Sequence, residues 1–139
     1  MATVNVDINF KNDVASRAGG ERVLNCFLCG TCTAGCPISE LEKDFNPRKI
    51  MRQVLAGMRD DVLEGPEIWR CYQCHTCVSH CPQDVRFADI IRVLRDMAVE
   101  EGKCDPKLPE KVNKLNEKYR KELLSEVNNI VGSKKKAKK

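Results

Sequence analysis

Two stretches of the sequence carry cysteines in the same arrangement, "CFLCGTCTAGCP" at residues 26–37 and "CYQCHTCVSHCP" at residues 71–82. In each stretch three cysteines fall within seven residues, a fourth follows four positions later, and a proline comes next. Cysteine thiolates bind metals, and three of them in so short a segment can wrap three corners of a cubane iron–sulfur cluster. The fourth ligand of each such cluster must then come from another part of the chain.

The spacing C-x₂-C-x₂-C-x₃-C-P is typical of bacterial ferredoxins, in which the last cysteine of each run binds the cluster of the other run. The doubled motif therefore predicts two [4Fe–4S] clusters with exchanged fourth ligands. Each cluster would join the two stretches across the 34 residues that separate the end of the first from the start of the second. We assign the first cluster to Cys26, Cys29, Cys32 and Cys81, and the second cluster to Cys71, Cys74, Cys77 and Cys36.

Zinc is the competing metal for clustered cysteines. A structural zinc ion takes four ligands, which commonly come as two separated pairs. Such a site would leave the third cysteine of each run without a clear use. The regular triplets therefore favour iron and sulfide over zinc.

The cysteine content also indicates a compartment. Nine cysteines in 139 residues is a high share. The first residues, "MATVNVDINFKND", lack the basic start and apolar run of a secretory signal, so we expect a cytoplasmic chain whose thiols stay reduced. The uncharged run at residues 23–39 is too short and too polar to span a membrane. Cys104, which lies outside both stretches, is expected to be structural.

The net charge of +4 is unevenly distributed. Residues 103–139 contain 12 Lys or Arg and 5 Asp or Glu, a net of +7, which leaves −3 for residues 1–102. The end of the chain, "GSKKKAKK" at residues 132–139, is predicted to be a solvated, disordered tail. Because the cysteine-bearing part is net acidic and lacks interleaved basic and aromatic residues, the sequence does not favour a zinc-dependent nucleic-acid binder.

The N-terminal segment is predicted to contain one short strand and one short helix. Apolar residues alternate with polar ones over "VNVDINF", which is the period of a half-buried strand. A helical stretch capped by Asn12 or Asp13 would follow and end near Gly19. The alternating apolar residues are Val4, Val6, Ile8 and Phe10.

Three longer helices are predicted, so the fold class is mainly α. Residues 46–65 form an amphipathic pattern with Asn46 as the cap and Pro47 at the first helical position. Residues 84–102 repeat this design after the second cysteine stretch. Apolar residues recur every three or four positions over residues 108–131, which predicts a C-terminal amphipathic helix.

These elements suggest four parts. Residues 1–20 would be an N-terminal strand and extension, 21–102 a helical domain with two clusters, 103–131 the C-terminal helix and 132–139 the basic tail. The apolar stripe of the C-terminal helix could fold back on its own core or dock on another protein, and the N-terminal strand could also add to a partner.

No motif for other chemistry is found. The sequence has neither a G-x-G-x-x-G frame after a strand nor a phosphate loop with G-K-[ST], so flavin or nucleotide binding is not indicated. No acid, base or nucleophile constellation appears outside the cysteine runs. Such a chain is most simply a non-catalytic electron carrier.

The two cysteine stretches, together with "NPRKIMRQVLAGM" and "IWRCYQCHTCVSHCPQDV", resemble the small iron–sulfur subunit of the heterodisulfide reductase family over about residues 22–102. The resemblance implies an α-helical ferredoxin fold. It also implies that the chain passes electrons from a flavin-bearing subunit to a catalytic one, which cleaves the disulfide of coenzyme M and coenzyme B. No adjacent Cys-Cys pair is present, so no disulfide chemistry is assigned to this chain itself.

Two alternatives stay open from the sequence. The same fold occurs in the iron–sulfur subunits of succinate, fumarate and glycerol-3-phosphate dehydrogenases. A free soluble ferredoxin would also carry the two clusters, but it would not need the N-terminal and C-terminal extensions.

Overall fold

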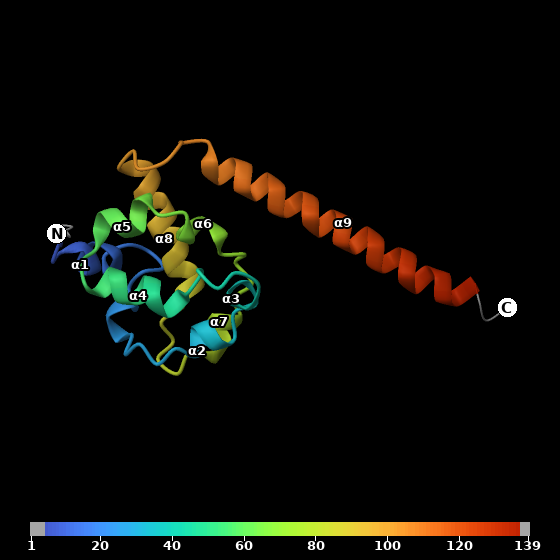
Figure 1. Ribbon diagram of the computed structural model, residues 1–139, viewed down its shortest axis with the longest axis horizontal. Helices are drawn as coiled ribbons and strands as arrows, with labels where there is room; N and C mark the ends of the chain where they lie inside the picture. Colours follow the sequence, from blue (N-terminus) through green and yellow to red (C-terminus); the bar gives the residue numbers. More distant parts are fainter. Residues whose placement is uncertain (1–4, 137–139) are drawn as a thin grey trace. The chain divides into compact units, whose positions relative to one another are not determined.

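The computed structural model describes residues 5–136, with side chains up to residue 132, and this part of the chain is helical without any strand. The predicted mainly α fold class is therefore confirmed. The chain divides into two units, one that ends at Asp105 and one that starts at Pro106. The first unit contains α1 (Phe10–Ala15), the 3-10 helix η1 (Val23–Asn25), α2 (Thr31–Ala34), α3 (Pro37–Leu41), α4 (Pro47–Leu55), α5 (Arg59–Glu64), α6 (Glu67–Arg70), α7 (Thr76–His80) and α8 (Phe87–Glu100) (Figure 1).

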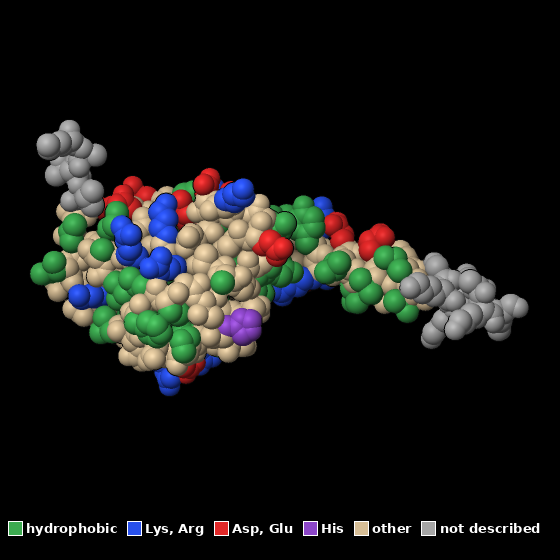
Figure 2. Space-filling view, turned by 60° about the horizontal axis from the view of Figure 1, so that its bottom comes forward, with side chains coloured by type: hydrophobic (Ala, Val, Ile, Leu, Met, Phe, Trp, Pro, Cys, Tyr) green, Lys and Arg blue, Asp and Glu red, His purple; other side chains and the backbone are tan. Residues whose placement is uncertain are grey.

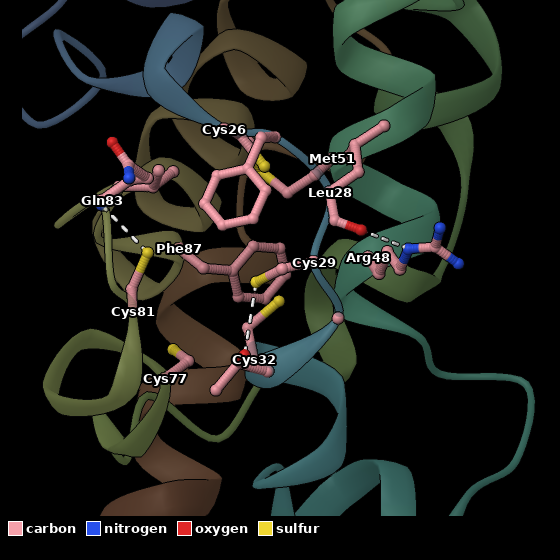
Figure 3. Close-up of a pocket in the computed structure, with 14 residues that line it drawn as sticks. Cys26, Leu28, Cys29, Cys32, Arg48, Met51, Cys77, Cys81, Gln83 and Phe87 are labelled. Atoms are coloured by element: carbon pink, nitrogen blue, oxygen red, sulfur yellow. Dashed lines mark hydrogen bonds between the residues drawn. The ribbon is translucent and has the colours of Figure 1, made fainter.

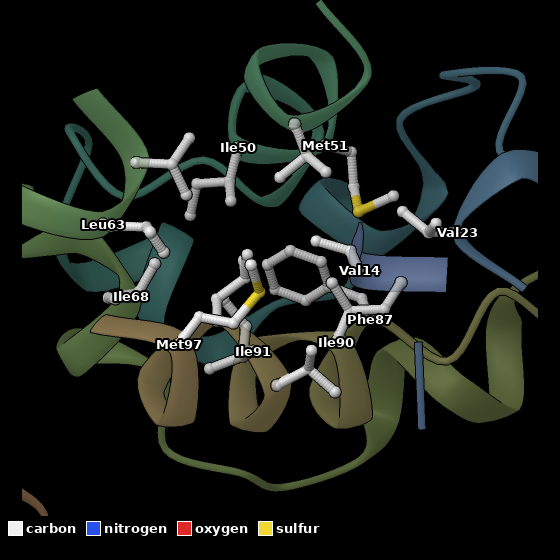
Figure 4. Close-up of a cluster of buried hydrophobic side chains, with 14 of the residues drawn as sticks. Val14, Val23, Ile50, Met51, Leu63, Ile68, Phe87, Ile90, Ile91 and Met97 are labelled. Atoms are coloured by element: carbon white, nitrogen blue, oxygen red, sulfur yellow. The ribbon is translucent and has the colours of Figure 1, made fainter. Parts of the chain in front are cut away.

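Helix α8 is the centre of the first unit. It was predicted from the apolar stripe of residues 84–102, and it buries apolar side chains along its whole length, from Phe87 to Ala98. Helices α4, α5 and α6 and the segment α1–η1 surround it, so that Met51, Leu63 and Val14 meet the side chains of α8 in one core (Figure 4). Each of these residues is almost fully removed from water, which is the main source of stability for so small a domain.

Helix α4 begins as predicted. The Asn46 side chain accepts a hydrogen bond from the Lys49 backbone N–H at 3.0 Å, and Pro47 occupies the first turn, where a missing N–H costs nothing. The predicted single helix over residues 46–65 is wrong, however, because the chain turns at Gly57 (φ +80°) before α5 starts. A Cβ at Gly57 would lie 2.4 Å from the carbonyl oxygen of Asp7, so the break makes room for the N-terminal segment.

The predicted N-terminal strand is also wrong. Val4 lies outside the described residues, and from Asn5 onward the segment is irregular and then helical. Val6 and Ile8 are exposed, whereas Phe10 is buried as the first residue of α1. The N-cap is Asn9, which starts this helix before the expected Asn12 or Asp13. The alternation of apolar residues thus reflects one buried anchor and two solvent-facing side chains.

Ion pairs, and not strand pairing, fix the N-terminal segment. The Arg59 guanidinium at the start of α5 contacts the carboxylates of Asp7, Asp13 and Glu101 at 2.8, 2.7 and 2.6 Å. It also lies 5.2 Å from the ring centroid of Phe10. These contacts raise the pKa of Arg59, with Glu101 as the largest cause. One partly buried cation therefore joins the N-terminal segment, α1, α5 and the end of α8.

The second unit is the helix α9 (Leu108–Lys136), which extends past the predicted end at Val131. Its polar positions carry ion pairs one turn apart, such as Lys114 with Glu110 and Lys121 with Glu117. The last part of the predicted basic tail, residues 137–139, lies outside the described residues. No helix in the described part of the chain is long and apolar enough to cross a membrane.

Candidate metal centres

The eight cysteines of the two motifs meet at one end of the first unit, where α2 packs against α7. They line two neighbouring pockets. The cysteines of the first pocket are Cys26, Cys29, Cys32, Cys77 and Cys81 (Figure 3). Those of the second pocket are Cys36, Cys71, Cys74 and Cys77.

Each pocket therefore combines cysteines from both motifs. Cys81, from the end of the second motif, lies in the pocket of the first triplet, and Cys36 lies in the pocket of the second. Cys77 and Phe87 line both pockets, so the two sites share a wall. Cys104 lines neither of these pockets and packs against the apolar core.

The two cysteine loops share a backbone conformation. The residue before the second cysteine has a positive φ in both loops, 60° at Leu28 and 58° at Gln73. The residue after it also has a positive φ, 88° at Gly30 and 61° at His75. Left-handed conformations cost energy for residues other than glycine, and their repetition at matching positions indicates that the loop geometry serves the site.

A threonine contacts the second cysteine of each loop. The Thr31 hydroxyl lies 3.3 Å from Cys29 Sγ, and the Thr76 hydroxyl lies 3.4 Å from Cys74 Sγ. The Thr31 contact is the largest cause of a lowered pKa at Cys29. A thiolate bound to iron has no proton to give, so in the metal-bound state each hydroxyl must be the donor.

The first loop is held by the start of α4. Arg48 donates from Nε to the carbonyl oxygen of Leu28 at 2.6 Å, and its backbone N–H donates to the Thr33 hydroxyl at 2.9 Å. The Thr33 hydroxyl donates in turn to Asn46 Oδ1, so the residue that caps α4 also fixes the loop. These contacts lie at the protein surface.

The second loop is held from inside. Arg95 of α8 is 9% exposed, and its guanidinium donates to the carbonyl oxygens of Ile68, Trp69 and Cys71 at 2.8, 3.2 and 2.9 Å. Gln73 adds a hydrogen bond to the carbonyl oxygen of Ala88 at 3.1 Å. Sequence reasoning missed Arg95 because a basic residue in an amphipathic helix gives no sign that it will be buried.

Burial determines the proton affinity of the inner thiols. It raises the pKa of Cys26, Cys32 and Cys71, and it raises the pKa of Cys77 to about 11. A free thiolate is thus unfavourable at these positions unless a positive charge compensates it. The iron ions of a cluster would supply that charge, so the donor set suits a bound metal.

The arrangement fits a cubane better than a single ion. Among the described residues, no three His, Cys, Asp or Glu side chains converge closely enough to hold one metal ion. A cubane does not require such convergence, because each cysteine binds a different iron at a separate corner. Two sets of four thiols around two pockets therefore fit two [4Fe–4S] clusters.

Comparison with known proteins agrees with this chemistry. A family model described as "4Fe-4S dicluster domain" matches residues 22–85, which include both motifs.

Several relatives are named as iron–sulfur subunits of heterodisulfide reductases. One from the CoB–CoM heterodisulfide reductase of Methanocaldococcus jannaschii is 39% identical over 112 residues, which cover 73% of this chain and 59% of that protein. Its counterpart in the H(2):CoB-CoM heterodisulfide,ferredoxin reductase of Methanothermobacter thermautotrophicus is 33% identical over 102 residues, covering 73% and 54%. The corresponding protein of the H(2)/formate-dependent enzyme of Methanococcus maripaludis is 42% identical over 78 residues, covering 56% and 41%.

The chain spans about half the length of the curated relatives that it matches. Within that span the similarity includes the whole cysteine-bearing domain. The chain is therefore a homologue of the small iron–sulfur subunit of heterodisulfide reductases, and its cofactors are two [4Fe–4S] clusters.

Proposed function

We propose that this chain is the electron-transfer subunit of a heterodisulfide-reductase-type complex. It would receive electrons from a flavin-bearing subunit, and it would pass them to a catalytic subunit that reduces the disulfide of coenzyme M and coenzyme B, or a related disulfide. The observation that carries the proposal is the pair of cysteine pockets with a shared wall, in a chain whose relatives are named as iron–sulfur subunits of such enzymes. We place this activity in the cytoplasm, where thiols stay reduced.

The ligand sets follow from the lining of the pockets. The first pocket contains the whole first triplet, and Cys81 supplies its fourth thiol. Cys77 borders both pockets, but the second pocket would have only three cysteines without it, so it belongs to the second set. We thus propose that Cys26, Cys29, Cys32 and Cys81 bind one cluster, and that Cys71, Cys74, Cys77 and Cys36 bind the other.

Each cluster accepts and returns one electron at a time, and the protein holds it at a suitable potential. The part of the chain that does this is compact. The shared wall of Cys77 and Phe87 keeps the path between the clusters short, and the buried core under α8 excludes water from one side. No proton donor or nucleophile is needed for this role.

Two surfaces are suited to hold partner proteins. Helix α4 exposes Arg48, Lys49 and Arg52 without a carboxylate among them, and Figure 2 shows Lys and Arg side chains gathered on one part of the face, beside apolar side chains. The second is the apolar stripe of α9, which a single helix cannot bury within its own unit. We propose that these surfaces, together with residues 1–20, contact the rest of the complex.

The test is an anaerobic affinity purification of the full chain from its native cells. Partner masses, flavin, iron and acid-labile sulfide are measured on the same sample. We expect about eight irons per chain, a flavoprotein and a further protein rich in adjacent Cys-Cys pairs. A dehydrogenase of the succinate or glycerol-3-phosphate kind would contradict the proposed pathway, as would a chain with both clusters and no partner.

A further inference from the structure

Arg95 lies in the middle of α8 and is almost completely buried, at 9% exposure. Its hydrogen bonds all go to carbonyl oxygens of the segment that leads into the second cysteine loop, the last of them to Cys71 itself. The guanidinium carbon also lies 5.3 Å from the ring centroid of Trp69. The side chain is thus fixed beside the first ligand of the second cluster.

This buried cation lacks a counter-ion in the protein. Among the described residues, no carboxylate lies within ion-pair distance of Arg95, whereas Arg59 in the same domain contacts three. Burial is the largest influence on Arg95 and lowers its pKa, and the nearby Cys71 thiolate acts in the opposite direction. Buried charges in proteins are normally paired, because an isolated one is strongly destabilising. The missing anion must therefore be found at the site.

We propose that Arg95 is the counter-charge of the second [4Fe–4S] cluster and that it raises the reduction potential of this cluster. A cluster gains one negative charge when it takes up one electron. A fixed positive charge beside it stabilises the reduced form more than the oxidised form, and burial keeps that interaction from being screened. The inference rests on the proposed ligand set and function, and it adds a residue that sets where electrons reside.

The first loop provides the contrast. Arg48 holds it by a similar hydrogen bond, to the carbonyl oxygen of Leu28, but its side chain is exposed to solvent. Water and salt screen an exposed charge. Arg48 should therefore affect the first cluster much less than Arg95 affects the second.

The test is an anaerobic redox titration of the iron-loaded full chain, with dithionite as the reductant and electron paramagnetic resonance as the readout. Arg95→Gln should shift the equilibrium of the second cluster toward its oxidised form by at least about tenfold, or about 59 mV for one electron. Arg95→Lys, which keeps the charge, should shift it by less than half as much. Arg48→Gln is the matched control and should leave the first cluster within a few-fold. A Cys74→Ala variant, which lacks one ligand of the second cluster, identifies its signal.

Iron and sulfide contents separate the possible failures. A wild-type chain without clusters would remove the proposed function itself. An Arg95→Gln chain with both clusters and an unchanged potential would overturn only the role of Arg95. If Arg95→Gln loses the second cluster, Arg95→Lys decides: retention at the wild-type potential supports the need for a charge, and loss or a shift as large as for a neutral side chain overturns it.

Discussion

The first and second cysteine loops have the same backbone geometry but different supports. Both place left-handed residues on either side of the second cysteine, and both set a threonine hydroxyl against its sulfur. The first loop is held by Arg48 at the surface, whereas the second is held by Arg95 inside the core. The motif thus determines the shape of each metal site, and the surrounding helices determine how firmly each site is held and how polar its surroundings are.

The largest expected effect comes from exchanging the comparison at the level of ligands. Cys81→Ala should remove the cluster of the first loop, although this cysteine belongs to the second motif. The reason is that Cys81 completes the pocket of the first triplet. Iron content should fall to about half, and the resonance spectrum that remains should match that of Cys29→Ala.

The reciprocal variant is the control for this prediction. Cys36→Ala should leave the same spectrum as Cys74→Ala, because Cys36 lies in the second pocket. A Cys81→Ala spectrum that matches Cys74→Ala would instead show that each motif binds its own cluster with all four of its cysteines.

A smaller effect is expected for the two supporting arginines. Arg95→Met leaves three carbonyl groups without their buried donor, and we expect a loss of about 3 kcal/mol in the stability of the second site. Arg48→Met should cost only about 1 kcal/mol, because water can replace the lost donor at Leu28.

Cluster release into an iron chelator at moderate urea, followed by visible absorbance, measures this difference. The Arg95→Met chain should lose its second cluster roughly a hundred times faster than the wild type and the Arg48→Met chain only several times faster. Equal rates for the two variants would mean that buried and exposed supports are equivalent, contrary to the comparison of the loops.

The smallest effect concerns the left-handed residue after the second cysteine. Gly30→Ala should destabilise the first loop by about 1–2 kcal/mol, since alanine is strained at a φ of 88° and its Cβ would lie 3.3 Å from Arg48 Cδ. His75→Gly should stabilise the second loop by at most about 1 kcal/mol, because the relief of strain is offset by a more flexible unfolded chain. Thermal unfolding of the iron-loaded variants in the absence of oxygen measures both, and a stabilised Gly30→Ala chain would contradict the assigned geometry.

The sequence predicted the parts of the fold that depend on local pattern. The spacing of the cysteines indicated both clusters, and the apolar periodicity located α8 and the start of α4 at Asn46. These features are local, because a cap or a stripe needs only a few neighbouring residues. The ligand assignment itself stays a prediction until the cysteine variants are measured.

Long-range contacts account for what the sequence did not indicate. Gly57 breaks the expected long helix because the backbone of Asp7, fifty residues away, lies against it. The period-two pattern around Ile8 suggested a strand because a sequence does not show that Arg59 would bind the segment through ion pairs. Arg95 was missed for a similar reason, since its partners in the second loop precede it by more than twenty residues.

The wall that Cys77 and Phe87 form between the pockets has a consequence for how the chain stores charge. Two cofactors so close together repel each other's added electron, so the uptake of a first electron makes the second harder to accept. The two clusters therefore titrate as an interacting pair, much as neighbouring acids do, and each measured midpoint describes the pair more than either member. At low driving force the chain holds a single electron, and a second enters only when its donor is strong enough to overcome this repulsion.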